Sequence, residues 1–524
     1  MSEQELTIPR VLARAADADP GAEAVVDGAV RVTYAELRER VREVVAAFTA
    51  AGVRPGDRIA IWAPNGLRWI VTAIGAASAG VAMVPLNTRY KGEEARRPLA
   101  KSGARMLFVV DGFLGIDYPA LLGLDPATGT VPELPDLEAV VTFNGGERPG
   151  VTSWEAFTGR GAEVPVEDVA ARMAAVRPDD IADILFTSGS TGVPKGVLST
   201  HEQNLRTFEA WAGRTGLRRG DRYLIVNPMF HTFGYKAGVL ACLLRGATMV
   251  LQDVFQPEET LRLIEAERIN VLPGPPTIYT SLLESPDRAE RDLSSLRLAV
   301  TGAADVPIAL VRRMRAELFP QVVTAYGLTE STGTVTVCSV DDDDEIIANT
   351  SGHAIENVEV VVVDGKGEPV PAGTDGEIHV RGYNVMRGYL DDPDATAEAI
   401  RDGWLVTGDR GRLDEHGNLT ITGRSKEMFT VGGFNVYPAE IENVLLRHDA
   451  VVESGVTGIP DERLGEVARA YVRVRAGRSV TADELIAHCR ERLANFKVPR
   501  EVVFVEDLPK SAAGKVQRAA LKDL

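Results

Sequence analysis

Residues 187–196 carry the side chains with the clearest chemistry, reading Thr-Ser-Gly-Ser-Thr-Gly-Val-Pro-Lys-Gly. Glycines let the backbone approach a ligand closely, so that several N–H groups can point at one anion. The hydroxyls add donors, and Lys195 adds a mobile positive charge. The apolar residues 184–186 indicate a buried strand before this stretch, and Ser199 followed by Glu202 indicates a capped helix after it. The pattern predicts a phosphate-binding loop between a strand and a helix.

Two common phosphate loops do not fit this stretch. A Walker A motif needs Gly-Lys followed by Ser or Thr, whereas Pro194 precedes Lys195 and Gly196 follows it. A dinucleotide loop needs Gly-x-Gly-x-x-Gly, which is also missing. A flexible surface linker of the same composition remains an alternative. The order of residues instead resembles the signature of the adenylate-forming superfamily, which includes acyl-CoA synthetases, peptide-synthetase adenylation domains and luciferases.

That resemblance implies ATP binding by this loop and by a second motif, residues 326–330, which read Tyr-Gly-Leu-Thr-Glu. In the family, the tyrosine of the second motif stacks on adenine, the threonine touches the α-phosphate and the glutamate holds Mg²⁺. The preceding small residues let the adenine ring lie against the backbone. The nucleotide contacts predicted from these motifs are Thr187, Ser188, Gly189, Ser190, Thr191, Gly192, Lys195, Gly302, Ala303, Ala304, Tyr326, Gly327 and Thr329. Thr187 and Glu330 are the predicted metal ligands.

The ribose is expected to lie between Asp409 and Arg424. A lone aspartate in a turn is usually a cap, but this pair resembles the family's two ribose contacts. A carboxylate can accept hydrogen bonds from both ribose hydroxyls, and a guanidinium donates from the other side. The resemblance further implies a hinge at Lys426, and a channel for the pantetheine of CoA beside Gly432 and Gly433.

Two more residues are candidates for catalysis. His231 stands in an apolar stretch, where a histidine is more often a core residue, but it falls where the family places a histidine at the mouth of the acyl pocket. Lys515 would ordinarily be an exposed C-terminal lysine, and it matches the family's C-terminal catalytic lysine. The resemblance implies that Lys515 bridges the acyl carboxylate and the α-phosphate. The carboxylate of the acid is itself the nucleophile, so catalysis depends on positioning and charge neutralisation.

The acid is predicted from shorter strings around His231, Tyr279 and Gly432. These resemble a group of actinobacterial ligases whose acid is a bicyclic propanoate left by steroid-ring breakdown. Lys236 either lies near a ring ketone or points to solvent. The alternatives are a medium- or long-chain fatty-acyl or aryl-acid CoA ligase, and a freestanding adenylation domain that loads a carrier protein. Thr430 stands where luciferases carry a further lysine, which disfavours that activity.

The elements that must position these residues follow an α/β pattern. Helical and strand periodicity alternate, which predicts parallel-sheet α/β subdomains with helices on both faces. Short strand-like pieces near 345–424 predict a β-rich subdomain. Residues 1–424 are expected to form the N-terminal domain, and 425–524 a small mobile α+β domain.

Composition excludes several other classes of protein. The chain has 524 residues and a net charge of −18, which argues against nonspecific nucleic-acid binding. Three widely spaced cysteines give neither a disulfide framework nor a cysteine zinc cluster, which fits a cytoplasmic location. The apolar run at 70–86 predicts a buried helix followed by a strand, because Pro85 breaks it, and no membrane span is expected. A homo-oligomer is compatible with the sequence.

Overall fold

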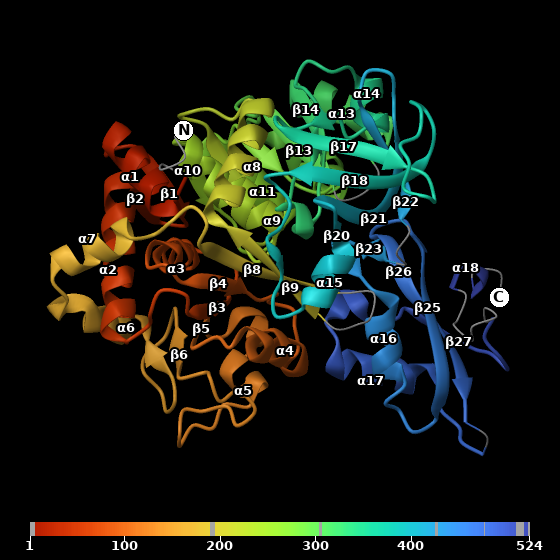
Figure 1. Cartoon of the computed structure of the whole chain (residues 1–524), viewed down its shortest axis with the longest axis horizontal. Coiled ribbons are helices and arrows are strands. Elements are labelled where there is room, and N and C mark those ends of the chain that lie inside the picture. The colour runs from red at the N-terminus through yellow and green to blue at the C-terminus, as the bar shows by residue number, and fades with distance from the viewer. Residues whose placement is uncertain are drawn as a thin grey trace.

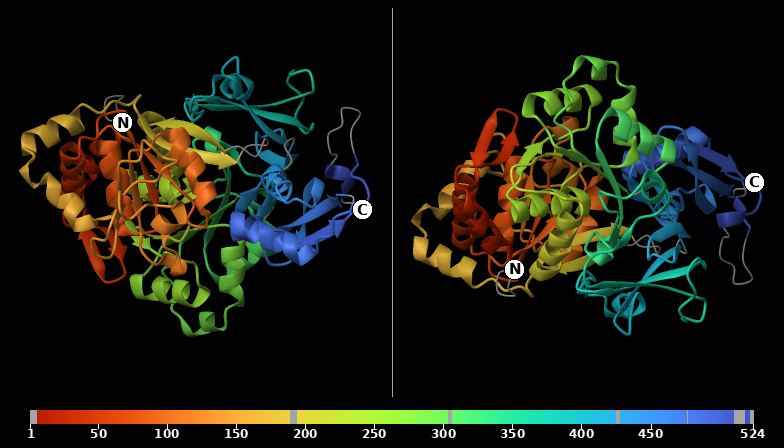
Figure 2. Two further views of the ribbon diagram at one scale, coloured as in Figure 1. Left: turned by 90° about the horizontal axis from the view of Figure 1, so that it is seen from below. Right: turned by 90° about the horizontal axis from the view of Figure 1, so that it is seen from above.

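The computed structural model describes residues 6–188, 194–302, 306–424, 428–475, 477–509 and 518–521. It contains two large sheets, a smaller β-rich sheet and a C-terminal α+β unit (Figure 1). The predicted α/β fold with a smaller second unit is confirmed. In the views of Figure 2, the C-terminal unit lies at one end of the molecule.

The first large sheet has eight strands in the order β19-β9-β8-β4-β3-β5-β6-β7. Strands β3 to β8 are parallel neighbours, whereas β9 runs antiparallel to β8, and β19 runs antiparallel to β9. Its strands are β3 (Arg58–Trp62), β4 (Ala82–Pro85), β5 (Met106–Val109), β6 (Ala139–Thr142), β7 (Thr152–Ser153), β8 (Ile181–Ser188), β9 (Pro194–Thr200) and β19 (Gly388–Tyr389).

The second large sheet has nine strands in the order β16-β15-β14-β13-β12-β10-β11-β1-β2, with parallel pairing from β14 to β1. Its strands are β1 (Glu23–Asp27), β2 (Val30–Thr33), β10 (Arg222–Ile225), β11 (Thr248–Leu251), β12 (Val271–Pro273), β13 (Leu298–Gly302), β14 (Gln321–Tyr326), β15 (Thr336–Val337) and β16 (His353–Ala354). The carboxyl ends of its parallel strands therefore meet at one edge, where α/β proteins commonly bind ligands.

Helices cover both sheets, and α3 lies between them, because it packs against β3, β4 and β8 of one sheet and β1 of the other. The α-helices of this part are α1 (Ile8–Ala18), α2 (Tyr34–Ala50), α3 (Leu67–Ser78), α4 (Gly92–Ser102), α5 (Tyr118–Leu122), α6 (Trp154–Gly159), α7 (Val166–Ala174), α8 (His201–Arg214), α9 (Thr232–Gly234), α10 (Ala241–Arg245), α11 (Pro257–Glu267), α12 (Pro276–Glu284), α13 (Ile308–Glu317), α14 (Asp344–Asn349) and α15 (Pro393–Ala399). The shorter or irregular turns are η2 (Phe113–Gly115), η3 (Arg160–Glu163), η4 (Tyr235–Leu240, a π-helix), η5 (Pro286–Glu290) and η6 (Thr329–Ser331).

Local capping explains where several helices begin. Thr33 accepts a hydrogen bond from the Glu36 backbone N–H, and the Glu36 side chain returns to the Thr33 N–H, as the sequence predicts. The predicted cap of α17 at Thr481 is confirmed in the same way. At α8 the predicted cap is one residue too early, because the cap is Thr200, paired with Gln203. The Ser199 side chain instead accepts a hydrogen bond from Lys236.

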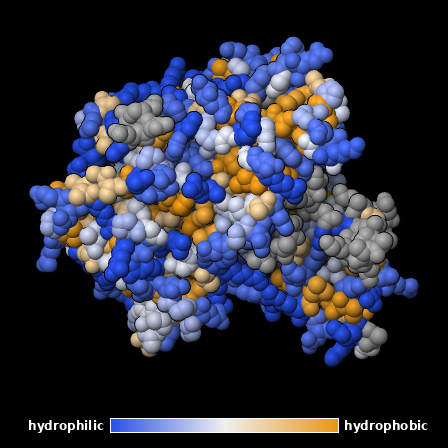
Figure 3. All heavy atoms as spheres, in the orientation of Figure 1, coloured by the Kyte–Doolittle hydropathy of each residue, from blue (hydrophilic) through white to orange (hydrophobic). Residues whose placement is uncertain are grey.

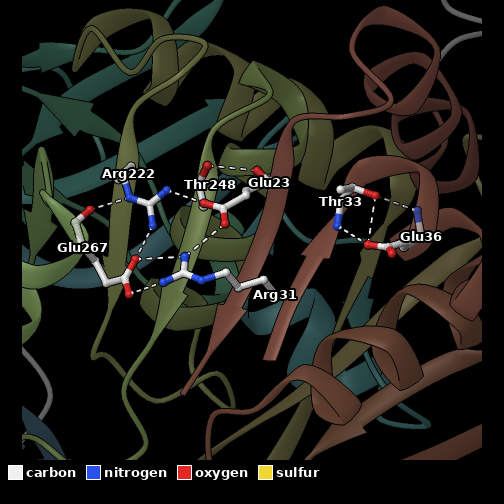
Figure 4. A network of polar contacts seen from close by, with 7 residues as sticks. All are labelled: Glu23, Arg31, Thr33, Glu36, Arg222, Thr248 and Glu267. Atoms are coloured by element: carbon white, nitrogen blue, oxygen red, sulfur yellow. Dashed lines mark hydrogen bonds and ion pairs between the residues drawn. The ribbon is translucent and has the colours of Figure 1, made fainter. Parts of the chain in front are cut away.

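The N-terminal hairpin β1–β2 completes the nine-stranded sheet through a charged network (Figure 4). Arg31 pairs with Glu267 at 2.6 Å, and Arg222 pairs with Glu23 at 2.6 Å and also with Glu267. The Thr248 hydroxyl donates to the backbone carbonyl of Glu23 at 2.9 Å. Two arginines thus alternate with two glutamates, and the first strands of the chain are fixed to strands formed much later in the sequence.

The β-rich sheet and the C-terminal unit complete the described chain. The former contains β17 (Val358–Val363), β18 (Gly376–Gly382), β20 (Ile400–Arg401), β21 (Trp404–Leu413) and β22 (Leu419–Arg424). The latter contains β23 (Phe429–Val431), β24 (Phe434–Val436), β25 (Val451–Asp461), β26 (Gly465–Val474), β27 (Glu501–Phe504), α16 (Pro438–Leu445), α17 (Ala482–Arg492), η7 (Asn495–Lys497) and α18 (Arg518–Leu521). Residues 429–498 of this unit include a hydrophobic core cluster of their own.

Hydrophilic residues dominate the face shown in Figure 3. The large apolar side chains exposed on the described chain are scattered, at Val30, Leu114, Val166, Leu446 and Phe504. Within the described ranges, no helix combines the length and apolar character needed to cross a membrane.

Candidate active site

The ends of β13 and β14 gather the residues predicted to hold adenosine. Gly302 pairs with Ala325 in the parallel register, and a Cβ on Gly302 would lie 2.6 Å from the Ala325 carbonyl oxygen, so a larger residue would displace the strand. Tyr326 ends β14, and its hydroxyl donates to Asp409 Oδ2 at 2.6 Å. Asp409 faces Arg424 across the antiparallel pair β21–β22. Residues far apart in the sequence thus meet at one sheet edge.

Asp409 is buried, with only 6% of the residue exposed. Its backbone N–H donates to the Thr407 hydroxyl at 3.1 Å, and that hydroxyl donates to the Ile378 carbonyl on β18. Such an anchored carboxylate can accept hydrogen bonds from two vicinal hydroxyls. Gly327 follows Tyr326, and a Cβ there would lie 2.3 Å from the Gly333 carbonyl oxygen, so this close turn requires glycine.

Glu330 is reached from a segment that sequence reasoning did not single out. The Tyr389 hydroxyl donates to Glu330 Oε1 at 2.8 Å, and Lys195 Nζ lies 5.0 Å from the centre of the Tyr389 ring. Burial, together with the negative charge of Glu330, raises the pKa of Tyr389 above its ordinary range, so the phenol stays protonated and acts as the donor. Among the described residues, no hydrogen bond reaches Glu330 Oε2, which leaves a carboxylate oxygen of the kind that Mg²⁺ prefers.

The predicted phosphate loop joins two strands, so the prediction of a strand-to-helix loop is wrong. Strand β9 runs antiparallel to β8, with Thr187 opposite Lys195 and Ser188 opposite Pro194. The Thr187 hydroxyl donates to the Lys195 carbonyl at 3.5 Å. Residues 194–200 pair with β8 before α8 begins, which a local Gly/Ser/Thr pattern does not reveal. Lys195 and Thr187 therefore flank the tip of a hairpin.

His231 precedes α9 and is exposed. Its Nδ1 lies 3.4 Å from the Phe233 backbone nitrogen, which donates to it. Surrounding protein atoms and the positive charge of Lys236 lower the pKa of His231, although its accessible surface limits that shift, so the ring is neutral near pH 7. The next residue, Thr232, borders the loop after Glu330, because a Cβ on Gly333 would lie 3.0 Å from Thr232 Cβ. The structure thus brings His231 toward the nucleotide residues.

Lys236 is fully buried, which contradicts the alternative that it points to solvent. Its Nζ lies 2.9 Å from Asp183 Oδ1 and donates to Ser199 Oγ at 2.9 Å. Asp183 Oδ2 also accepts from Asn204. Tyr235 is fully buried as well. The ammonium is therefore committed to the protein interior, and it gives no support to a contact with a ring ketone.

The Gly432–Gly433 pair forms the turn between β23 and β24. Their φ angles of +55° and +86° match a tight hairpin turn that requires positive φ at both positions. A Cβ on Gly433 would lie 3.5 Å from Pro275, at the start of α12 in the nine-stranded-sheet unit. The hairpin of the C-terminal unit thus touches the larger part of the molecule.

The remaining predicted residues lie outside the described residues. They are Gly189, Ser190, Thr191, Gly192, Ala303, Ala304, Lys426 and Lys515. The described chain on either side of 510–517 lies in the C-terminal unit, where Leu508 and Leu521 pack with Tyr471. Arg518 forms a two-point ion pair with Glu442 at 2.5 and 2.8 Å. In Figure 1, α18 is at the end of this unit farther from the two large sheets.

Comparison with known families matches two patterns to this chain. The AMP-binding enzyme family matches residues 12–390, and the AMP-binding enzyme C-terminal domain matches residues 440–515. The first match includes Glu330 and Tyr389, and the second ends at Lys515.

Two full-length relatives carry the name 3-[(3aS,4S,7aS)-7a-methyl-1,5-dioxo-octahydro-1H-inden-4-yl]propanoyl:CoA ligase. The protein from Rhodococcus jostii (strain RHA1) is 48% identical over 525 residues, covering 100% of this chain and 99% of the relative. That from Mycobacterium tuberculosis (strain ATCC 25618 / H37Rv) is 50% identical over 520 residues, covering 99% of each. A double mutant of o-succinylbenzoate CoA synthetase from Bacillus subtilis, bound with a product analogue, superposes with a TM-score of 0.82 at 28% identity, covering 98% of each chain.

Proposed function

Because the chain belongs to the AMP-binding enzyme family of adenylate-forming ligases, we propose that it couples a compact, ring-bearing propanoate to CoA. It is an AMP-forming acyl-CoA ligase that uses ATP, Mg²⁺ and CoA. The ring-bearing acid is suggested by the two relatives at 48% and 50% identity, whose printed names specify a bicyclic diketo propanoate. Both alignments span nearly the whole chain, so the similarity is not confined to the nucleotide motifs.

The observation that carries the proposed site is the convergence of Tyr326, Asp409 and Glu330 on one edge, beside Lys195. In this proposal, Tyr326, Gly302 and Gly327 hold adenine, whereas Asp409 and Arg424 hold the ribose. Lys195 and the hairpin tip receive the phosphates that leave as pyrophosphate. Bound Mg²⁺ neutralises part of the triphosphate charge. Glu330 Oε2 would hold that ion, with Thr187 as the second ligand.

The protein's task in the first step is positioning, since the carboxylate of the acid itself attacks the α-phosphorus. In this proposal, Thr329 orients the α-phosphate and His231 borders the entry of the acid. Lys515 would neutralise charge shared by the carboxylate and the α-phosphate. In the second step the CoA thiol attacks the acyl-adenylate and AMP leaves. We propose that the C-terminal domain, residues 425–524, then rotates about Lys426.

The arrangement described here is proposed to be the one that forms the thioester. The Gly432–Gly433 turn touches Pro275, where it can border a narrow channel for the pantetheine arm. Helix α18, which follows Lys515, lies at the outer end of the C-terminal unit, away from β14 and β21 (Figure 1). A rotation that brings Lys515 to the nucleotide would have to remove the glycine turn from Pro275.

The experiment that tests the substrate is a panel of acids assayed for AMP release and for free acyl-CoA. The panel contains bicyclic keto-propanoates, aryl acids and straight chains of increasing length, with no carrier protein added. We expect a bicyclic propanoate to give a higher kcat/KM than palmitate. Preference for long straight chains would leave a fatty-acyl ligase, and AMP release without free acyl-CoA would indicate a carrier-protein acceptor.

Two broader predictions belong to the same proposal. A cytoplasmic location is supported by the three cysteines, Cys242, Cys338 and Cys489, all of which are buried and unpaired. A homo-oligomer is tested directly by sedimentation of the purified chain.

A further inference from the structure

Tyr389 lies where two parts of the proposed triphosphate site meet. Its hydroxyl contacts Glu330, 59 residues earlier in the chain, at 2.8 Å. The ammonium of Lys195, on the neighbouring strand β9, lies 5.0 Å from the centre of its ring. Only 9% of Tyr389 is exposed. One side chain therefore touches both the proposed metal ligand and the proposed phosphate-binding cation.

The backbone around Tyr389 is fastened to the same two elements. Strand β19 pairs with β9, with Tyr389 opposite Val197, and the Leu390 N–H donates to the Gly196 carbonyl at 2.7 Å. On the other side, the Met386 N–H donates to the Glu330 carbonyl at 2.8 Å. Residues 386–390 thus form a strap that joins η6 to the strand carrying Lys195.

The backbone at Tyr389 is also held by α15. Its backbone N–H donates to the Thr396 hydroxyl at 2.9 Å, and that hydroxyl donates to the Asp392 carbonyl at 2.8 Å. The preceding Gly388 has φ +150°, and a Cβ there would lie 3.0 Å from Thr396 Cγ2. The first turn of α15 therefore fixes the strap from the outside.

We propose that Tyr389 is a positioning residue for adenylation: its hydroxyl orients the Glu330 carboxylate, and its ring holds the Lys195 ammonium until the triphosphate arrives. With Oε1 bound by the phenol, the carboxylate presents Oε2 to a dication in one orientation. A ring quadrupole attracts a cation weakly enough to release it to a phosphate. This inference rests on the proposed roles of Glu330 and Lys195.

The test compares Tyr389→Phe with a matched control, Tyr383→Phe. The control tyrosine lies nearby in the chain, and its hydroxyl donates to the backbone carbonyl of Glu356 at 2.9 Å. The Arg206 guanidinium carbon lies 4.1 Å from the centre of its ring. Both substitutions remove one phenol hydroxyl beneath a cation. Only Tyr389→Phe frees a carboxylate, because the Tyr389 hydroxyl donates to the Glu330 side chain. The Tyr383 hydroxyl donates to a backbone carbonyl instead.

Binding is measured first, by calorimetric titration of a nonhydrolysable ATP analogue at several Mg²⁺ concentrations. Losing a hydrogen bond to a charged group is expected to weaken Mg²⁺ binding by about tenfold. We expect Tyr389→Phe to need about tenfold more Mg²⁺ for half-maximal binding, while Tyr383→Phe matches the wild type. Conversion of a synthetic acyl-adenylate and CoA to thioester should be unchanged in both variants.

A double-mutant comparison separates this inference from the proposed site. Glu330→Gln should abolish the Mg²⁺ dependence, and adding Tyr389→Phe should then cost nothing further, because the phenol acts through the carboxylate. If Glu330→Gln behaves as the wild type, the proposed metal site is wrong. If Glu330→Gln loses the Mg²⁺ dependence of binding but Tyr389→Phe shows the wild-type Mg²⁺ dependence, only the role of Tyr389 is overturned.

A structural role makes a different prediction. If Tyr389 only supports packing, Tyr389→Phe should lower the thermal midpoint and slow both half-reactions equally, which would overturn the proposal. Should this variant fail to fold, Tyr389→His retains a ring and an N–H donor. Recovery of the wild-type Mg²⁺ dependence in that variant would support the proposal, and its loss in a folded protein would contradict it.

Discussion

Among the described residues, two lysines are almost fully buried, and their surroundings differ. Lys236 is enclosed within the large N-terminal part, where Asp183 is its ionic partner. Lys497 is 3% exposed and belongs to the C-terminal unit, but it contacts both Glu94 of the N-terminal part at 2.8 Å and Glu440 of its own unit at 3.1 Å. The first pair lies within the large N-terminal part, whereas the second joins that part to the C-terminal unit.

The pKa shifts of the two lysines run in opposite directions. Burial lowers the pKa of Lys236, and one carboxylate only partly offsets it. Burial also disfavours the charged form of Lys497, but Glu440, Glu94 and Tyr90 outweigh it and raise its pKa above the ordinary value. Because Lys497 retains Glu440 within its own unit, it can leave Glu94 without becoming an unpaired buried charge. Such an arrangement suits the proposed rotation, in which this contact would break and reform.

The largest effect on stability is expected for Lys236→Met. This change leaves Asp183 charged and buried without its cation, which typically costs about 3–5 kcal/mol. Chemical denaturation should show that loss, and both half-reactions should fall together. Adding Asp183→Asn removes the uncompensated charge and should restore at least half of the stability. No restoration would mean that Lys236 acts through packing.

Lys515→Ala should affect one half-reaction alone. Loss of one preorganised charge contact typically costs about 10²–10³ in rate, or roughly 3–4 kcal/mol. Pyrophosphate release from acid and ATP should fall by that factor, while thioester formation from a synthetic acyl-adenylate stays near the wild-type rate. Lys510→Ala is the control and should be tolerated far better. Equal damage to both steps would assign Lys515 to folding or CoA binding.

Glu94→Gln weakens the Lys497–Glu94 pair with the mildest change. Glutamine can still accept the Lys91 N–H at the start of α4, which Glu94 accepts at 2.9 Å. Lys497 keeps Glu440, so only the attraction between the two units is weakened. We expect the thioester-forming arrangement to lose about tenfold in population, ~1.4 kcal/mol. Single-turnover kinetics should show a slower thioester step with adenylation not slowed; two equally slowed steps would contradict this.

Arg447→Ala should have the smallest effect. Arg447 of the C-terminal unit also pairs with Glu93 of the N-terminal part at 2.6 Å, but both side chains are about two-fifths exposed, at 42% and 43%. Exposed pairs of this kind contribute about 0–1 kcal/mol and are screened by salt. The ratio of the two half-reaction rates should change by less than about fivefold, and raised ionic strength should remove the difference. A larger effect would make the exposed pair the dominant interdomain contact.

The sequence predicted features whose partners are close in the chain. The capping boxes at Thr33 and Thr481 need residues three positions apart, so their pattern is visible locally. At α8, two adjacent hydroxyl residues each have a suitable partner three positions later, and the choice of Thr200 over Ser199 follows from a tertiary contact, the bond between Ser199 and Lys236. The hairpin at residues 187–196 was missed for the same reason, because pairing of β9 with β8 is not encoded by glycine and hydroxyl content.

Long-range polar contacts could not be predicted from local sequence patterns. The Tyr389–Glu330 bond spans 59 residues and the Lys497–Glu94 pair spans 403. Nothing near Tyr389 distinguishes it from a tyrosine in an ordinary short strand. By contrast, Tyr326, Asp409 and Glu330 were found through a family motif, which carries tertiary information that composition and periodicity lack.

The network of Figure 4 has a consequence for synthesis on the ribosome. Glu23 and Thr248 are hydrogen-bonded partners 225 residues apart, so β1 is made long before the strand beside which it will lie. At typical elongation rates that interval lasts on the order of ten to forty seconds. During this time the apolar Val25 and Val26 have no sheet to join, and the nascent hairpin is open to chaperones or to wrong pairing. The N-terminal hairpin therefore cannot reach its final place until β11 has been made, although it leaves the ribosome first.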